Sequence, residues 1–125
     1  MKITVKTTVD TTKLAAIDEA AKRALALTAE VIHGQVVQAQ VMPFRTGHLQ
    51  NESTFVDQSG ASEGHVDIVS ATPYARRLYY HPEYNFDTTN NPSAGGMWFE
   101  PWANGEYSES ATATFAALLK REAGL

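Results

Sequence analysis

The sequence predicts a small α+β domain, and three observations carry that prediction. Residues 2 to 9 alternate in the manner of a strand, a long segment with apolar residues three and four apart follows, and two short alternating segments flank a Gly- and Ser-rich turn. With 125 residues and 43% hydrophobic content, the chain is long enough for one modest core. We therefore expect a single domain over residues 1–125.

The first element is a predicted strand over residues 2–9. Its β-branched residues Ile3, Val5 and Val9 fall on one face with Thr7, while lysine and threonine occupy the other face. This alternation is typical of a strand that is buried on one side and polar on the other.

A long helix is predicted next, from about residue 12 to residue 41. Asp10 and the threonines after it are N-cap candidates, and Pro43 ends the helix because the residue before a proline disfavours helical geometry. The apolar stripe comprises Leu14, Ile17, Ala21, Leu25, Thr28, Ile32, Val36 and Ala39. Such a helix would be about 40 Å long, so we expect one end to project or to pack on another chain. Gly34 indicates either a close approach by another group or a locally weak helix.

A β-hairpin is predicted from residues 53–57 and 65–71, with a flexible tip between them. Neither face of its second strand is purely polar, which favours a central position in the sheet. Residues 82–97 form a predicted long loop, rich in Asn, Pro, Gly and Thr. A C-terminal helix should run from about Glu100 to Gly124, although Gly105 interrupts its first turns and moves the expected start toward Glu106.

Composition excludes several classes of function. The chain has no cysteine, so it has no disulfide framework, thiolate metal site or cysteine nucleophile. No apolar run approaches the length that spans a bilayer, and we expect neither export by a signal peptide nor membrane insertion. The chain has 10 basic and 14 acidic residues, and most of the acidic ones lie in its second half. Such a surface repels phosphates, so stable nucleic-acid binding is not expected.

The aromatic residues are concentrated in one part of the chain. Nine of the twelve lie between residues 74 and 107: Tyr74, Tyr79, Tyr80, Tyr84, Phe86, Trp98, Phe99, Trp102 and Tyr107. A domain of this size cannot bury them all, so we expect about half to form core and the rest to form a protein interface.

No residue pattern has the form of a catalytic or cofactor signature. The four histidines are His33, His48, His65 and His81, and they lie in different predicted elements without metal-ligand spacing. Glycine-rich phosphate loops and nucleophile elbows are also missing from the sequence. We therefore expect no metal, no cofactor and no enzymatic activity.

Two short motifs remain, Pro-Phe-Arg-Thr-Gly-His-Leu-Gln-Asn-Glu-Ser at residues 43–53 and Pro-Tyr-Ala-Arg-Arg-Leu-Tyr-Tyr-His at residues 73–81. In the first, Pro43 stops the helix, Gly47 supplies backbone freedom, and Leu49 begins the next packed segment. Arg45 has no local acidic partner, which leaves either a solvated side chain or one that reaches the acidic half of the chain or a neighbouring subunit. For Arg76 and Arg77, an inter-subunit salt bridge or stacking contact is favoured over nucleic-acid binding.

The order of these motifs, followed by Trp98-Phe99-Glu100, resembles that of the small minor capsid proteins of tailed bacteriophages. The likeness extends from about Ala15 to Lys120. The matching positions are Pro43, Thr46, Gly47, Leu49 and Ser53 in the first motif, and Pro73, Tyr74, Ala75 and Tyr80 in the second.

The resemblance implies both a fold and a function. It implies that the long N-terminal helix and the C-terminal helix pack on a small antiparallel β-sheet. It also implies a structural virion protein, assembled in the host cytoplasm, that joins or completes the head–tail neck as a homo-oligomeric ring and docks on other neck, head-completion or tail proteins. The interface candidates are Arg45, Thr46, Gly47, Tyr74, Arg76, Arg77, Tyr79, Tyr80, Tyr84, Phe86 and Trp98.

Two alternatives belong to other classes of function. A non-viral adaptor would grip one soluble partner with the aromatic loop. A small metal-dependent hydrolase would use His48, His65 or His81 with nearby carboxylates.

Overall fold

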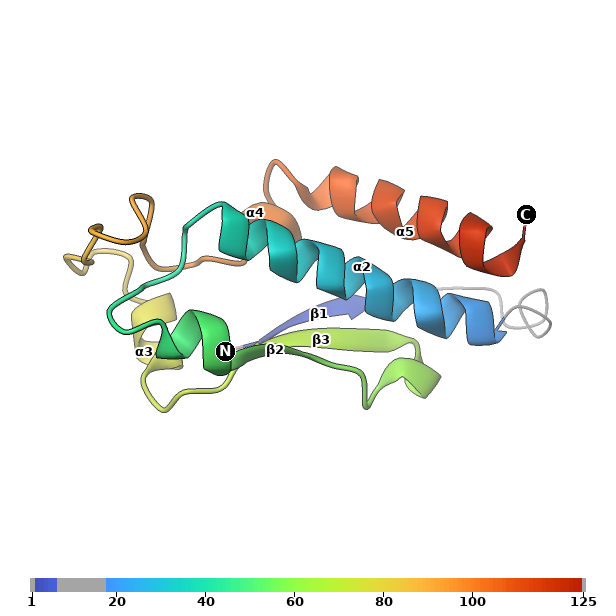
Figure 1. Cartoon of the computed structure of the whole chain (residues 1–125), viewed down its shortest axis with the longest axis horizontal. Helices are drawn as coiled ribbons and strands as arrows, with labels where there is room; N and C mark the ends of the chain where they lie inside the picture. The colour runs from blue at the N-terminus through green and yellow to red at the C-terminus, as the bar shows by residue number, and fades with distance from the viewer. Residues whose placement is uncertain (1, 7–17, 125) are drawn as a thin grey trace.

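The computed structural model describes residues 2–6 and 18–124, which form an α+β domain (Figure 1). The α+β class predicted from sequence is thereby confirmed. In chain order the elements are β1 (Lys2–Lys6), α2 (Asp18–Gln38), the π-helical turn η1 (His48–Glu52), β2 (Thr54–Asp57), the 3₁₀ turn η2 (Ala61–Glu63), β3 (His65–Ser70), α3 (Ala75–Tyr79), α4 (Glu100–Ala103) and α5 (Ser108–Ala123).

The three strands form an antiparallel sheet in the order β1-β3-β2. The predicted hairpin and the central place of its second strand are both confirmed. Ile68 of β3 lies opposite Ile3 on one side and Val56 on the other, so an apolar row crosses all three strands on one face of the sheet. The described part of the first strand is Lys2–Lys6, and the predicted positions 7–9 lie outside the described residues.

Helix α2 lies across the apolar face of the sheet (Figure 1). Its buried positions include Ala21, Leu25, Thr28, Ile32 and Val36, as the predicted stripe requires. The predicted end at residue 41 is wrong, because the helix stops at Gln38 and Gln40 takes a left-handed φ of 56° that breaks helical geometry. Its 21 described residues are about 31 Å long, and predicted positions 12–17 lie outside the described part of the chain.

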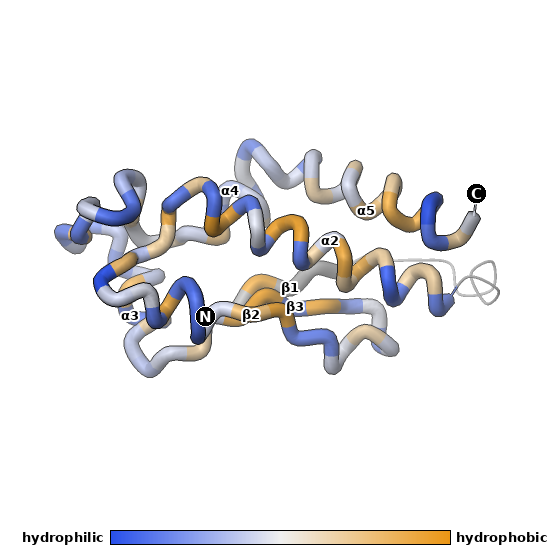
Figure 2. Tube along the Cα trace, in the orientation of Figure 1, coloured by the Kyte–Doolittle hydropathy of each residue, from blue (hydrophilic) through white to orange (hydrophobic). Residues whose placement is uncertain are grey.

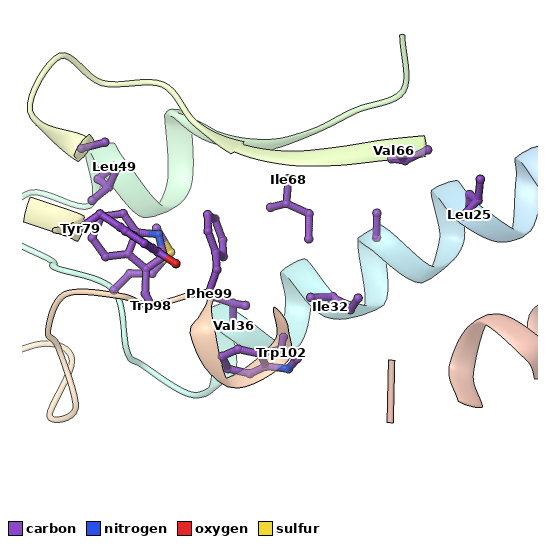
Figure 3. Packing of buried hydrophobic residues seen from close by; sticks show 13 residues of the cluster. Leu25, Ile32, Val36, Leu49, Val66, Ile68, Tyr79, Trp98, Phe99 and Trp102 are labelled. Carbon is purple, nitrogen blue, oxygen red and sulfur yellow. The ribbon is translucent and has the colours of Figure 1, made fainter. Parts of the chain in front are cut away.

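The core fills the space between α2, the sheet and the segment that leads into α4. Figure 3 shows Tyr79 and Trp98 close to Leu49, with Phe99 between them and Ile68. The Trp98 ring meets Tyr79 edge-on at a centroid distance of 4.8 Å, and both side chains are at most 3% exposed. The aromatic segment after the long loop therefore closes the core at one end of the sheet.

The predicted C-terminal helix is split into α4 and α5 at Gly105. A Cβ atom there would lie 2.8 Å from the Cα of Pro101, so the tight turn between the two helices requires glycine. Helix α5 packs against α2, and its far end is held by Arg23, whose Nε lies 3.3 Å from Oε2 of Glu122. None of the residues of α5 is fully buried.

The predicted loop over residues 82–97 is tied to the rest of the fold at several points. The amide nitrogen of the buried Asn91 side chain donates to the carbonyl of Met42 and to Oε1 of Gln50, each at 2.8 Å. The backbone N–H of Gly95 donates to the carbonyl of Val41. In Figure 2 this segment is mostly hydrophilic, while the hydrophobic stretches lie along the strands and the middle of α2. The loop therefore keeps a polar surface although its base is anchored.

Candidate functional site

An open pocket of about 710 Å³ lies at the end of the molecule opposite the C-terminus of α5. Three segments that are distant in sequence contribute to it: residues 43–49, α3 with the residue before it, and residues 84–87. The lining residues are Pro43, Phe44, Arg45, Thr46, Gly47, His48, Leu49, Tyr74, Arg77, Leu78, Tyr84, Asn85, Phe86 and Asp87. The pocket therefore joins the two sequence motifs to the start of the long loop.

Gly47 shapes the wall that comes from the first motif. Its φ is 84°, in the left-handed region, and a Cβ atom would lie 2.9 Å from Cζ of Phe44 and 2.9 Å from Nδ2 of Asn51. Its carbonyl accepts a hydrogen bond from the N–H of Asn51 at 2.8 Å, which starts the η1 turn. Glycine is thus required both for the backbone conformation and for the close packing of Phe44.

Helix α3 places part of the second motif in the lining of the same pocket. Ala75 is fully buried, and the N–H of Leu78 donates to the carbonyl of Tyr74. With Ala75 and Tyr79 turned into the core, Tyr74 and Arg77 lie on the open side of this short helix, where Tyr74 is 44% exposed. The buried half of the motif therefore holds the exposed half in place.

Arg77 is held by a tyrosine from the long loop. Its Nε donates to Oη of Tyr84 at 3.2 Å, and its Cζ atom lies 5.8 Å from the centroid of the same ring. The ring of Tyr84 also stacks on His81 at a centroid distance of 4.7 Å. The hydrogen bond to Tyr84 raises the pKa of Arg77 above its usual value, so the guanidinium remains charged at any pH the fold tolerates.

The carboxylate of Asp87, in the long loop, is the negatively charged group of the pocket lining. The side chain and the backbone N–H of Thr89 bond to Asp87 and lower the pKa of its carboxyl group, and the nearby charge of Arg45 lowers it further. Arg45 is itself exposed, which agrees with the solvated side chain considered from sequence, and its charge acts on Asp87 without a direct ion pair between them among the described contacts. The pocket combines apolar and aromatic walls with two guanidinium groups and one carboxylate.

Seven of the predicted interface residues line this pocket: Arg45, Thr46, Gly47, Tyr74, Arg77, Tyr84 and Phe86. Arg76 and Tyr80 are exposed but are not part of its lining. The prediction for Tyr79 and Trp98 as interface residues is wrong, because their exposed fractions are 3% and 1% and both belong to the core. A large aromatic side chain stabilises the fold by burying its apolar area, and this gain is lost when the side chain is exposed at the surface.

Of the nine clustered aromatic residues, four are buried and three are exposed. Tyr79, Trp98, Phe99 and Trp102 are core, Tyr84 and Phe86 are half-buried, and Tyr74, Tyr80 and Tyr107 are exposed. The expected division into core and surface is therefore observed, although the assignment of individual residues differs.

A hydrogen-bonded chain of three side chains beside the pocket was not predicted from sequence. Nδ1 of His48 lies 2.8 Å from Oε2 of Glu52, and Nε2 of His48 lies 3.1 Å from Oγ of Ser53. The four-residue spacing of His48 and Glu52 is visible in the sequence, but Ser53 joins them only because the chain winds as a π-helical turn.

Comparison of the chain with protein-family models, with curated proteins and with solved structures finds no match.

The described residues 2–6 and 18–124 contain no group of three or more His, Asp or Glu side chains arranged to hold a metal ion. The histidines considered for a hydrolase each lie near a carboxylate: His48 lies near Glu52, and His81 lies near Glu83. His65 lies near Glu63 of η2 and near Asp67 of its own strand. Within the same residues, no helix is both long enough and apolar enough to span a bilayer.

Proposed function

We propose that this chain is a structural virion protein of a tailed bacteriophage, which joins or completes the head–tail connection by oligomerising and by docking on neighbouring neck or tail proteins. The observation that carries the proposal is the convergence of the two motifs behind the family resemblance. They are separate in sequence, and both contribute residues to the lining of one open pocket.

The chemistry of this pocket suits contact with another protein. Tyrosine and arginine are enriched in protein interfaces because they combine apolar area with fixed hydrogen-bonding groups. Here Tyr74 is exposed beside Arg77, and Arg77 is already oriented by its hydrogen bond to Tyr84. A side chain ordered before binding loses less conformational entropy when a partner docks.

A protein within a stack or ring contacts neighbours on more than one side. Helix α5 supplies a second accessible surface, since it packs on α2 along one side only and has no fully buried residue. The pocket and α5 lie at different places on the molecule, so both are accessible to different neighbours at once (Figure 1).

The proposal is tested by a nonsense mutation in this gene within the phage that carries it. Electron microscopy of lysates should show filled heads separated from finished tails, and a plasmid copy of the wild-type gene should restore joined particles. Normal infectious particles without the gene product would overturn the neck assignment, and a pull-down for a soluble partner would then test the adaptor alternative.

A matched pair of variants tests the pocket itself. Tyr74→Ala should fail to restore joined particles, whereas Phe55→Ala should restore them, because both aromatic residues are 44% exposed but Phe55 lies in β2, outside the pocket and outside α5. Both purified variants should keep the unfolding midpoint within a few degrees of the wild type. Equal complementation by the two variants would show that the pocket is not the docking surface.

A further inference from the structure

Ser53, His48 and Glu52 form an ordered chain of hydrogen bonds whose sequence of groups is serine, imidazole, carboxylate. Oγ of Ser53 lies 3.1 Å from Nε2 of His48, and Nδ1 of the same ring lies 2.8 Å from Oε2 of Glu52. Each of the two ring nitrogens therefore has one partner, and the two partners differ in chemistry.

The backbone winding produces this alignment. In the η1 turn the N–H of Ser53 donates to the carbonyl of His48 at 3.0 Å, a five-residue step in place of the four-residue step of an α-helix. Residues five apart are then placed one above the other, which brings Ser53 over His48 while Glu52 remains within reach. Such turns are frequent at functional sites.

The residue after Ser53 anchors the end of the turn. The hydroxyl group of Thr54 donates to the carbonyl of Leu49 at 2.7 Å and lies 2.9 Å from Oγ of Ser70 on the neighbouring strand. Thr54 is 4% exposed, so these bonds are shielded from water. Ser53 is thereby held between a buried strand and a closed turn.

One tautomer of the imidazole satisfies both contacts. With the proton on Nδ1, the ring donates to the Glu52 carboxylate, and Nε2 is left to accept the hydroxyl proton of Ser53. A carboxylate that fixes the tautomer in this way leaves Nε2 as the basic atom next to the hydroxyl group. This is the arrangement of nucleophile, base and orienting acid by which serine is activated in acyl-transfer enzymes.

The relay is open to a substrate. His48 is itself one of the pocket residues, and its side chain is 52% exposed. The half-buried Phe44 lies in the same lining and offers an apolar surface in the pocket that contains the imidazole. An ester with a small apolar group would therefore find a place for that group next to the base.

We propose that Ser53 is a nucleophile activated by His48, with Glu52 as the positioning residue, and that it reacts with small carboxylic esters. Oγ of Ser53 bonds to the carbonyl carbon while its proton passes to Nε2. The ester C–O bond then breaks, and the departing alcohol takes that proton. A water molecule next attacks the acyl-serine, gives one proton to Nε2, and releases the carboxylic acid as Ser53 recovers its hydrogen.

The expected rate enhancement is modest. A positioned general base contributes about 10²- to 10⁴-fold, and an exposed relay belongs near the low end because water competes for every group. Glu52 is 71% exposed, so its hold on the ring is weakened by solvent. We expect Ser53 to react about 100-fold faster in the wild type than in a variant without the imidazole.

The test uses the whole chain and diethyl 4-nitrophenyl phosphate, which phosphorylates activated serines and releases 4-nitrophenolate. The wild type should release one equivalent, with the diethyl phosphate found on Ser53 by peptide mass spectrometry. Ser53→Ala should abolish the labelling, His48→Gln should slow it about 100-fold, and Glu52→Gln should slow it less. Turnover of 4-nitrophenyl acetate should decrease in the same order.

Ser62→Ala is the matched control, since Ser62 is an exposed serine in η2 that does not belong to the relay, and its loss should change neither labelling nor turnover. Thermal unfolding of each variant checks that the fold is kept. Labelling at another residue, no labelling at all, or equal labelling of the wild type and His48→Gln would each overturn the proposal and leave the three side chains as a cap of the η1 turn. None of these outcomes bears on the docking role of the pocket.

Discussion

Replacement of Trp98 by alanine should destabilise the fold severely. Trp98 is 1% exposed, meets Tyr79 edge-on at 4.8 Å and lies 6.2 Å from the ring of Phe99. Its indole Nε1 is 3.4 Å from Oγ of Ser70, a long hydrogen bond that contributes little. Nearly all of its contribution to stability is therefore apolar contact.

The magnitude follows from the buried area. A tryptophan side chain buries about 150–250 Å², which at about 25 cal/mol per Å² gives an upper bound of about 4–6 kcal/mol. Truncations of buried tryptophan cost about 3–5 kcal/mol, and the edge-on contact with Tyr79 adds to the transfer term. We expect a loss of about 4 kcal/mol, which is a large part of the roughly 5–15 kcal/mol that holds such a domain folded.

Urea unfolding followed by tryptophan fluorescence and circular dichroism measures this loss. With an m-value of about 2 kcal/mol per M, the midpoint should decrease by about 2 M. Tyr80→Ala is the comparison, because Tyr80 is adjacent in the aromatic cluster but 53% exposed, and it should lose about 1 kcal/mol or less. A loss below about 1 kcal/mol for Trp98→Ala, or equal losses for both variants, would refute the assignment of Trp98 to the core.

Two further predictions concern α2 and the buried tyrosine. Gly34→Ala should raise the free energy of unfolding by about 1 kcal/mol, because Gly34 lies within α2 and nothing is within 4 Å of the added Cβ atom; a decrease in the urea midpoint would contradict this. Burial, with smaller contributions from Glu100 and Tyr80, raises the pKa of Tyr79 from 10.0 to about 12. Stability should therefore be constant below pH 10 with respect to this group and should decrease between pH 10 and about 12, since the unfolded chain loses the phenol proton first. Tyr79→Phe should have a shallower decline of urea midpoint over that range, and an unchanged slope would show that this phenol does not titrate differently in the two states.

Gly34 also bears on assembly. The sequence left open whether another group approaches it or the helix is merely weak, and no group of the described chain lies near it. If Gly34→Ala stabilises the isolated protein but blocks assembly, a neighbouring chain approaches α2 at this position.

The strands and the hairpin were predictable because their information is local. Alternation along residues 65–70 identifies a strand, and apolar residues on both of its faces favour a central place, which the pairing of Ile68 with Ile3 and Val56 confirms. The break at Gly105 was likewise visible, because a glycine within a helical pattern marks a turn.

The end of α2 and the burial or exposure of individual aromatic residues were not predictable in this way. Gln40 ends the helix by adopting a left-handed conformation that its side chain does not favour, and the carbonyls of Val41 and Met42 just beyond it accept hydrogen bonds from Gly95 and Asn91. A contact between residues about fifty positions apart leaves no local pattern.

The amino-acid sequence by itself determined the α+β class, the central place of β3 in the sheet and the need for glycine at position 47. Each of these depends on the side-chain period or on backbone sterics within a few residues. Tertiary structure alone decided that Trp98 and Tyr79 are core while Tyr74 and Arg77 face the pocket, and that Ser53 meets His48. These outcomes depend on which apolar surfaces pack against one another and on the backbone conformation of the turn between packed elements. Both are properties of the whole chain, because burial is shared among segments that the sequence keeps far apart.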